Sequence, residues 1–268
     1  IATLALNEVQ DDSNFDSIEL WYNTALEDAS VPGEWLLEVV TSSTGSCTIS
    51  YELGEEVKEI DVAVEAGTFP SCGGSNFLDL DECIQTNLIT NNPGILLDID
   101  CNSLEGSVVL SMVYRDASTF YLLANENSGS AEFQVNNGCF GRSVGSSCDV
   151  EASLWAGYAL NKLNSNINTL LYLKENYDSS DSTESSLLYL MTGEENYIND
   201  LVDQQKADGS FDRNVFETGL ASLALSESSL FPEALDNARA FLRDEQTEEG
   251  HWSEDVASTS MALYGAFG

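Results

Sequence analysis

Positive charge is scarce in this sequence. Nine residues are lysine or arginine and 46 are aspartate or glutamate, which gives a net charge of −37 over 268 residues. A surface of this kind repels nucleic acid and anionic lipid, so we expect neither as a partner. Two interpretations of the acidity stay open: a halophilic protein whose carboxylates are screened by salt, or a surface that collects Ca²⁺.

Other features that carry chemistry are also missing. The sequence has one histidine, no CxxC pair and no Cys/His cluster, which argues against a structural zinc site. P-loop and GxGxxG motifs are absent, which argues against the enzymes built around them. No apolar run is long enough to span a membrane, so we expect no membrane span in this chain.

Cysteine is present in an even number. Six cysteines beside a single histidine indicate disulfides and an oxidising compartment, so we expect an extracellular or cell-surface protein. We interpret a chain that begins at Ile1 without a signal peptide as the mature part of an exported precursor. The six residues are Cys47, Cys72, Cys83, Cys101, Cys139 and Cys148.

Three pairings are open for the first four of these cysteines, and sequence alone does not decide among them. We prefer Cys47–Cys72 with Cys83–Cys101, because each bridge then closes a local loop. The remaining pair, Cys139–Cys148, would close a long turn.

Internal repetition is the strongest pattern in the chain. The strings 205–211 and 246–252 share the pattern QxxxGx(aromatic) and are offset by 41 residues, a third copy lies at 134–140, and 33–35 supplies a shorter GxW. A helix rich in alanine and other small residues follows each of the three longer copies. The motif residues are Gly33, Trp35, Gln134, Gly138, Phe140, Gln205, Gly209, Phe211, Gln246, Gly250 and Trp252.

Each repeat is expected to contain a small-residue helix, a short turn, an amphipathic helix and a Gly-aromatic turn. The N-terminus fits this scheme, because residues 2–8 line up with residues 221–227. A degenerate copy without the motif begins at residue 166. The expected helices are 1–8, 16–28, 150–163, 166–177, 183–192, 194–206, 214–226, 232–245 and 255–267.

Each part of the repeat has a physical role. Helices of Ala, Ser, Thr and Gly pack closely side by side, which suits the inner ring of a barrel of helices. Amphipathic partners such as 235–243 suit an outer ring with one wet face. The glycine permits the positive φ of a chain reversal after a helix. The aromatic side chain can cover a helix end, and the glutamine amide can bond exposed backbone groups.

These repeats resemble the QW-type repeats of the terpenoid cyclase/prenyltransferase α/α-toroid superfamily, which also includes the thioester domains of complement and macroglobulin proteins. The resemblance covers about residues 1–35 and 134–268. The whole arrangement is similar to uncharacterised exported archaeal proteins that combine such repeats with a cysteine-bearing β domain. The resemblance implies a toroid fold and a cell-surface role, with no established activity.

The segment between the repeats is different in kind. Short alternating or apolar runs separated by turn clusters predict an antiparallel β-sandwich inserted into the toroid. We therefore expect the first toroid repeat at 1–34, the inserted β-sandwich domain at 35–133 and the remaining toroid repeats at 134–268. The expected strands are 35–40, 47–53, 59–64, 95–99, 106–113 and 119–124.

No catalytic site follows from the resemblance. A class II terpene cyclase would need a DxDD acid, and the nearest string, 79–82 (DLDE), lies in the β segment. A thioester would need a GCGEQ-like string, and 138–142 reads GCFGR. The only histidine, His251, falls in a turn without a free cysteine beside it for zinc. Acidic pairs at 98–100 and 178–181 complete no EF-hand loop, so calcium is a candidate ligand without a defined site.

The sequence therefore predicts an α+β fold, an incomplete α/α toroid of helix pairs with an inserted disulfide-bonded antiparallel β-sandwich. We expect a non-enzymatic exported structural or interaction protein, a subunit of filament or surface-layer type that assembles with copies of itself through its chain ends. The alternative is a secreted toroid enzyme, cyclase-like or carbohydrate-active, or a small-ligand carrier.

Overall fold

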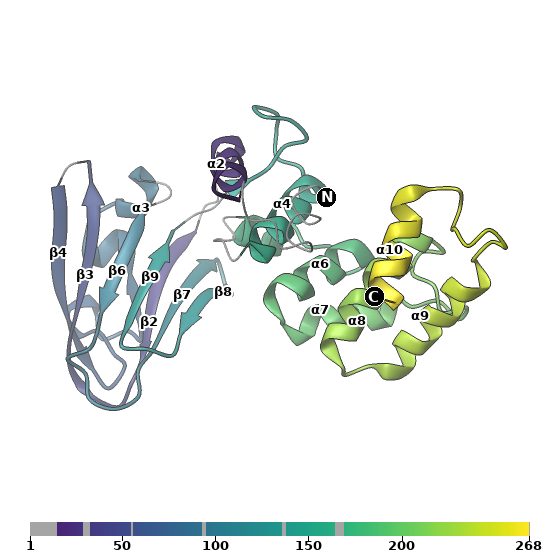
Figure 1. The fold of residues 1–268 in the computed structure, drawn as a ribbon. Coiled ribbons are helices and arrows are strands. Elements are labelled where there is room, and N and C mark those ends of the chain that lie inside the picture. The colour runs from purple at the N-terminus through teal and green to yellow at the C-terminus, as the bar shows by residue number, and fades with distance from the viewer. Residues whose placement is uncertain are drawn as a thin grey trace. The chain divides into compact units, whose positions relative to one another are not determined.

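The chain folds into two compact units, which we call the helical unit and the β unit (Figure 1). The computed structural model describes residues 15–28, 33–54, 56–92, 95–135, 138–163 and 169–267. Among these, the helical unit contains residues 15–24, 149–163 and 176–267, and the β unit contains residues 25–148 and 169–175. The β unit thus includes the whole of 35–133 and extends beyond it at both ends.

Two four-stranded antiparallel sheets form the β unit. One sheet has the strand order β5-β2-β7-β8 and the other has the order β4-β3-β6-β9. The first sheet consists of β2 (Glu34–Val40), β5 (Phe77–Asp79), β7 (Val109–Asp116) and β8 (Thr119–Glu126). The second consists of β3 (Thr44–Leu53), β4 (Glu56–Glu65), β6 (Leu96–Asp100) and β9 (Ser130–Gln134).

The two sheets share one apolar core, because alternate side chains of a strand point to the same face. Trp35 and Leu37 of β2 enter this core from the first sheet, and Ile49 and Leu97 enter it from the second. The exposed positions of β4 are mostly charged, which discourages pairing of this edge strand with another chain. The alternation that predicts strands therefore also predicts a sandwich.

All six expected strands are present, and the structure adds shorter ones that the sequence did not reveal. β5 has only three residues and β9 only five, too few for a clear alternation between neighbouring turn residues. Short helical turns also interrupt the β unit: a 3₁₀-helix η1 (Pro70–Cys72), a π-helix η2 (Leu80–Ile84) and α3 (Leu88–Asn91).

The structure forms three disulfides, and the preferred pairing of the first four cysteines was wrong. Cys47 pairs with Cys101, and Cys72 pairs with Cys83. The register of β3 on β6 explains the first bridge, because Thr48 lies opposite Asp100 and so brings the preceding and following cysteines together. Cys139 pairs with Cys148, as the sequence predicted.

The helical unit consists mainly of successive helices that come after the β unit in the chain. Their bounds agree closely with those expected from the repeats. They are α4 (Val150–Lys162), α6 (Ser182–Thr192), α7 (Glu195–Gln204), α8 (Val215–Ser228), α9 (Pro232–Asp244) and α10 (Val256–Phe267). The N-caps Asp149, Asp181 and Asn214 accept backbone N–H groups at the starts of α4, α6 and α8, which fixes where these helices begin.

The expected outer helix 166–177 is shorter and belongs to the β unit, which corrects its assignment to the toroid repeats. Here the structure has α5 (Leu170–Glu175), and residues 169–175 group with the β unit. Leu171 is buried in the core of the sandwich, and Lys174 Nζ donates to the backbone carbonyl of Leu122 in edge strand β8. The sequence pattern of a buried helix does not reveal which core the helix enters.

Near the N-terminus, α2 (Phe15–Ala25) ends earlier than the expected helix 16–28. The chain instead forms β1 (Glu27–Asp28), which pairs with β10 (Gly138–Cys139). This pairing removes the last residues of the expected helix. The expected helix 1–8 lies outside the described residues.

Candidate interaction surface

Four helices of the helical unit form a row. α4 contacts α6, α6 contacts α8, and α8 contacts α10, while the amphipathic α7 and α9 pack against α6 and α8 (Figure 1). The α7 and α9 helices bury one face each, whereas α8 buries residues around most of its circumference. We call α4, α6, α8 and α10 the helix row.

The contact between α8 and α10 depends on glycine. A Cβ atom added to Gly265 of α10 would lie 2.0 Å from the backbone oxygen of Gly219 in α8, and one added to Gly219 would lie 2.7 Å from the backbone oxygen of Met261. The two backbones therefore touch at this crossing. The nearby Ser222 is fully buried, and its hydroxyl donates a hydrogen bond to the Thr218 carbonyl. Burial of this hydroxyl at the contact therefore leaves its hydrogen bond intact.

On its other side, α10 exposes an apolar face. Val256, Leu263, Tyr264 and Phe267 are the exposed large hydrophobic residues of this helix, and Ser260 lies between them. We call these five residues the α10 face. Their spacing of three to four residues places them on one side of the helix.

The exposure of the α10 face differs from that of the equivalent residues of α8, which lie 41 positions earlier in the sequence. Val256 of α10 is 81% exposed, whereas its counterpart Val215 in α8 is 8% exposed. Leu263 is 49% exposed, whereas its counterpart Ser222 is fully buried. Leu263 and Phe267 are larger and more apolar than their α8 counterparts Ser222 and Ser226, and this difference is the signal that the sequence contains.

The turns that precede α8 and α10 have the same hydrogen bonds, which gives the glutamine motif its structural role. Gln205 Nε2 donates to the carbonyls of Gly209 and Ala234, and Gln246 Nε2 donates to the carbonyl of Gly250. Gly209 and Gly250 have φ values of +88° and +89°, a conformation that L side chains rarely adopt.

The aromatic residue of each motif joins its turn to the following helix. The backbone N–H of Phe211 donates to the hydroxyl of Thr218, and that of Trp252 donates to the hydroxyl of Thr259, each over 3.0 Å. Both aromatic side chains are buried. Trp252 Nε1 also donates to the carbonyl of Leu242, one of the last carbonyls of α9. These turns therefore fix the direction of each new helix in the row.

The other two copies of the motif lie in the β unit. Trp35 lies in β2 and packs edge-to-face against Tyr114 in the sandwich core. Gln134 is the last residue of β9, Gly138 begins β10, and Phe140 is buried just after it. A glycine two residues before an aromatic residue is equally compatible with a strand, so the short motif alone does not identify a helix end.

The acidic string nearest to a cyclase motif has a structural role. Asp79 Oδ1 accepts the backbone N–H groups of Asp81 and Glu82, and Asp81 Oδ1 accepts that of Ile89 over 2.6 Å. These bonds hold η2 and α3 together. The string also lines a cavity of about 430 Å³ in the β unit. Within the described residues, no group of three or more His, Cys, Asp or Glu side chains is arranged to hold a metal ion.

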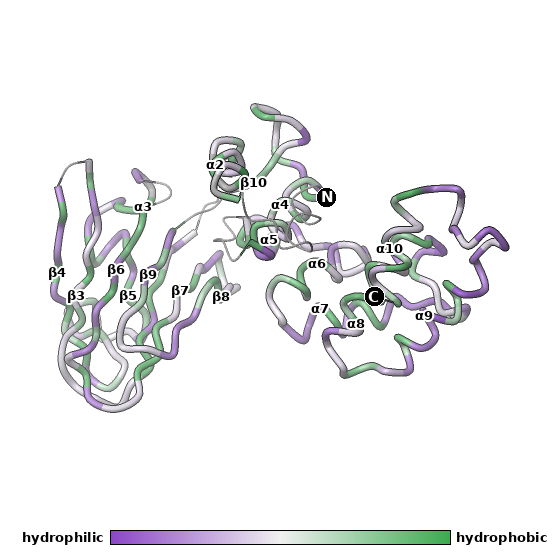
Figure 2. Tube along the Cα trace, in the orientation of Figure 1, coloured by the Kyte–Doolittle hydropathy of each residue, from purple (hydrophilic) through white to green (hydrophobic). Residues whose placement is uncertain are grey.

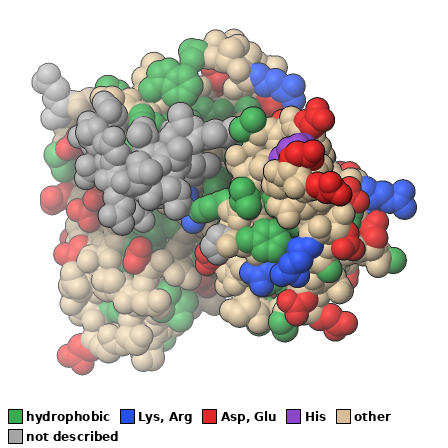
Figure 3. Space-filling view, turned by 45° about the vertical axis from the view of Figure 1, so that its right-hand side comes forward, with side chains coloured by type: hydrophobic (Ala, Val, Ile, Leu, Met, Phe, Trp, Pro, Cys, Tyr) green, Lys and Arg blue, Asp and Glu red, His purple; other side chains and the backbone are tan. Residues whose placement is uncertain are grey.

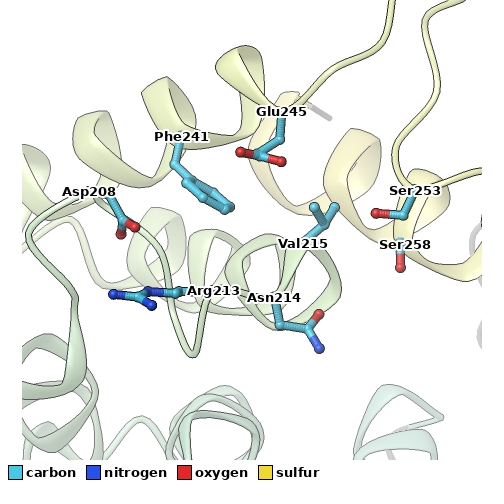
Figure 4. A pocket seen from close by; sticks show the side chains of 8 residues that line it. All are labelled: Asp208, Arg213, Asn214, Val215, Phe241, Glu245, Ser253 and Ser258. Carbon is cyan, nitrogen blue, oxygen red and sulfur yellow. The ribbon is translucent and has the colours of Figure 1, made fainter.

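A second cavity, of about 410 Å³, lies in the helical unit at the starts of α8 and α10 (Figure 4). Phe241 and Val215 project toward its centre, with Asp208 and Arg213 on one side and Ser253 on the other. Its full lining is Asp208, Arg213, Asn214, Val215, Phe241, Glu245, Ser253 and Ser258. These groups could bond a small polar ligand, but the eight of them include no nucleophile paired with a base.

His251 is part of the second repeat turn. It is half-buried, and its Nδ1 accepts the backbone N–H of Glu254. Its own backbone N–H donates to the hydroxyl of Thr247. The residue therefore stabilises the turn before α10.

Two glutamates near the starts of row helices have perturbed acidity. Burial raises the pKa of Glu217 in α8, and the hydroxyl of Ser182 in α6 partly offsets this by donating to its carboxylate. Burial likewise raises the pKa of Glu184 in α6, although the backbone N–H of Asp178 donates to it. Each lies on the third residue of its helix, where a carboxylate favours the helix start.

Charge separates the α10 face from its surroundings. The turn before α10, residues 244–255, is strongly hydrophilic, whereas α10 itself has no charged residue (Figure 2). Acidic side chains are prominent on the visible surface and basic ones are few (Figure 3). An uncharged helix face is therefore a place where another acidic molecule can approach without direct repulsion.

The comparisons with protein-family models, curated proteins and solved structures find no match to this chain. Among the described residues, we find no helix with the length and apolar character needed to cross a membrane.

Proposed function

We propose that this chain is a non-enzymatic, exported structural protein that associates with copies of itself through the α10 face. The single observation that carries the proposal is the exposure of this face. The matching side of α8 is covered by the next helix of the row, whereas Val256 and Leu263 of α10 remain in water. Exposed apolar patches on acidic, soluble surfaces commonly mark interaction sites.

Three disulfides support the exported location, because such bonds persist in oxidising compartments and are rare in the cytosol. The helix row and its two glutamine turns support the likeness to an incomplete α/α toroid, with α7 and α9 in outer positions. The net charge of −37 supports a saline setting, in which salt screens the carboxylates over about 8 Å at physiological ionic strength and less in brine.

Light scattering of the full chain at several protein concentrations tests the proposal. In molar NaCl we expect a mass that rises with concentration, and a Leu263→Glu variant that stays monomeric with unchanged helix content. Ser226→Glu is the matched control, because Ser226 is an exposed residue on α8 that lies outside the α10 face. A wild-type chain that remains monomeric at all concentrations would contradict the proposal.

A ligand carrier or carbohydrate-active enzyme is the second candidate. It is favoured by Glu184 and Glu217 at the starts of neighbouring row helices, because burial raises the pKa of both carboxyls toward the range that suits a general acid. Calcium-free hydrolysis assays on acidic and neutral polysaccharides test this alternative. Activity that is lost in Glu217→Gln, with the fold intact, would favour the enzyme over the structural protein.

A further inference from the structure

The α8–α10 crossing shows how one row helix receives the next. Gly265 of α10 packs directly against Gly219 of α8. The repeat offset of 41 residues places Ser260 of α10 at the position of Gly219 in α8. Ser260 is exposed and lies in the middle of the α10 face. The α10 face therefore has its own small residue at the point where a following helix would cross.

The N-terminal segment 1–8 has the sequence of a row helix. Residues 2–8 (ATLALNE) line up with residues 221–227 of α8 (ASLALSE). In α8 the counterparts of Ala2, Ala5 and Leu6 are Ala221, Ala224 and Leu225, all of them buried. Ala224 in turn aligns with Gly265 of α10 through the repeat offset of 41 residues, so Ala5 occupies the position of Gly265. The segment thus also has a small residue where the crossing requires one.

We propose that segment 1–8 of one copy adds to the α10 face of a second copy as the next helix of the row, with Ala5 crossing Ser260. This inference rests on the proposed self-association and names its occupant and register. Ile1 and Leu6, which correspond to Met261 and the buried Ala266 of α10, would supply the apolar contacts to the α10 face.

Charge supports this occupant over other surfaces of the chain. Residues 1–7 contain no charged side chain, and neither does α10, in a protein of net charge −37. Two copies therefore meet at neutral segments, where like-charge repulsion is smallest. Such a contact is heterologous, so it propagates head to tail. One helix pair buries less than the roughly 800 Å² per partner of a standard interface, and we expect association at about micromolar concentrations.

Complementation between two full-length variants tests the geometry. Leu6→Glu damages the segment and keeps the α10 face, whereas Leu263→Glu damages the face and keeps the segment. We expect each variant alone to be monomeric and their equimolar mixture to form one-to-one dimers that grow no further. Analytical ultracentrifugation measures the masses, and circular dichroism checks that both variants fold.

The other outcomes separate this inference from the proposed function. If Leu6→Glu assembles like wild type while Leu263→Glu does not, the α10 face has a different occupant, such as another α10, and the inference is overturned while the proposed function stands. If both variants assemble like wild type, the α10 face is not the contact and both proposals are wrong. A monomeric wild type overturns both as well.

Cross-linking tests the register. In a mixture of Ala5→Cys and Ser260→Cys chains, a short bismaleimide should join the two variants efficiently. A mixture of Ala5→Cys with Ser226→Cys is the control, because Ser226 lies on α8. We expect at least about tenfold more cross-linked dimer in the first mixture, a ratio equivalent to about 1.4 kcal/mol. Equal yields in the two mixtures would refute the Ala5–Ser260 crossing.

Discussion

The β unit contains all six cysteines, whereas the helical unit contains none and brings two helices into backbone contact at glycines. The β unit fills its core with large side chains such as Phe69 and Tyr114. Buried positions of α8 instead include Ala221 and Ser222. The β unit is therefore stabilised by the packing of large side chains and by its disulfides. The helical unit is stabilised by the close packing of helices at small residues. Each unit should fail for a different reason.

Removing the disulfide Cys47–Cys101 should have the largest effect. This bridge closes 54 residues, so its loss in a Cys47→Ala/Cys101→Ala variant should lower the free energy of unfolding of the β unit by about 4 kcal/mol. Hydrogen exchange followed by mass spectrometry in urea resolves the two units. Removing Cys72–Cys83, which closes 11 residues, should cost about 3 kcal/mol. An equal loss of protection in the helical unit would contradict the division.

Gly265→Leu should produce the opposite pattern. Its side chain would meet the Gly219 carbonyl, so the α8–α10 contact must open, at a cost of about 3 kcal/mol to the helical unit. Protection from hydrogen exchange should fall in α8 and α10 and remain in the sandwich. Ala257→Leu, at an exposed position of the same helix, is the control and should stay within about 0.5 kcal/mol of wild type.

The two glutamine turns allow a finer comparison within the helical unit. Gln205 bonds two carbonyls and is partly buried, whereas a single bond, to Gly250, is described for the exposed Gln246. Gln205→Ala should therefore cost about 1.5 kcal/mol and Gln246→Ala about 0.5 kcal/mol in thermal or urea unfolding. A larger loss at Gln246 would show that the turn before α10 carries more of the stability than its hydrogen bonds indicate.

The smallest expected effect is the pH dependence of stability that Glu217 and Glu184 cause. Burial raises the pKa of Glu217 and Glu184 above the ordinary 4.5, so the folded helical unit binds more protons than the unfolded chain between 4.5 and the raised values. The free energy of unfolding should rise as the pH falls toward 4.5, by less than about 1 kcal/mol per group because water screens both carboxylates. Glu217→Gln should flatten this part of the pH profile in urea titrations. An unchanged profile would show that Glu217 does not contribute.

Much of the fold could be predicted from local patterns. Alternation along 35–40 and 47–53 predicted strands because one face of each strand is buried, and the repeat offset predicted α8 and α10 because each comes after the same turn. The disulfide pairing could not be predicted, since it is set by the register of β3 on β6. Nor could the place of α5, because its leucines fit either core.

The candidate surface was only partly accessible to sequence reasoning. The small residues of the row helices predicted close packing, but not that Gly219 and Gly265 form the crossing. Trp35 shows the limit of a short motif, because the same three residues fit a helix end and a strand. Whether a residue such as Leu263 is covered depends on whether another helix packs against it, which a local pattern does not encode.

The placement of α5 in the β unit has a consequence for biosynthesis. The sandwich lacks the helix that lies along edge strand β8 until residue 175 has emerged from the ribosome, after α4 has already been made. An excised fragment ending at residue 148 would retain all three disulfides, yet leave the β8 edge without Lys174 and the core without Leu171. Such a fragment should oxidise correctly and still aggregate, through an edge that the intact chain closes late in translation.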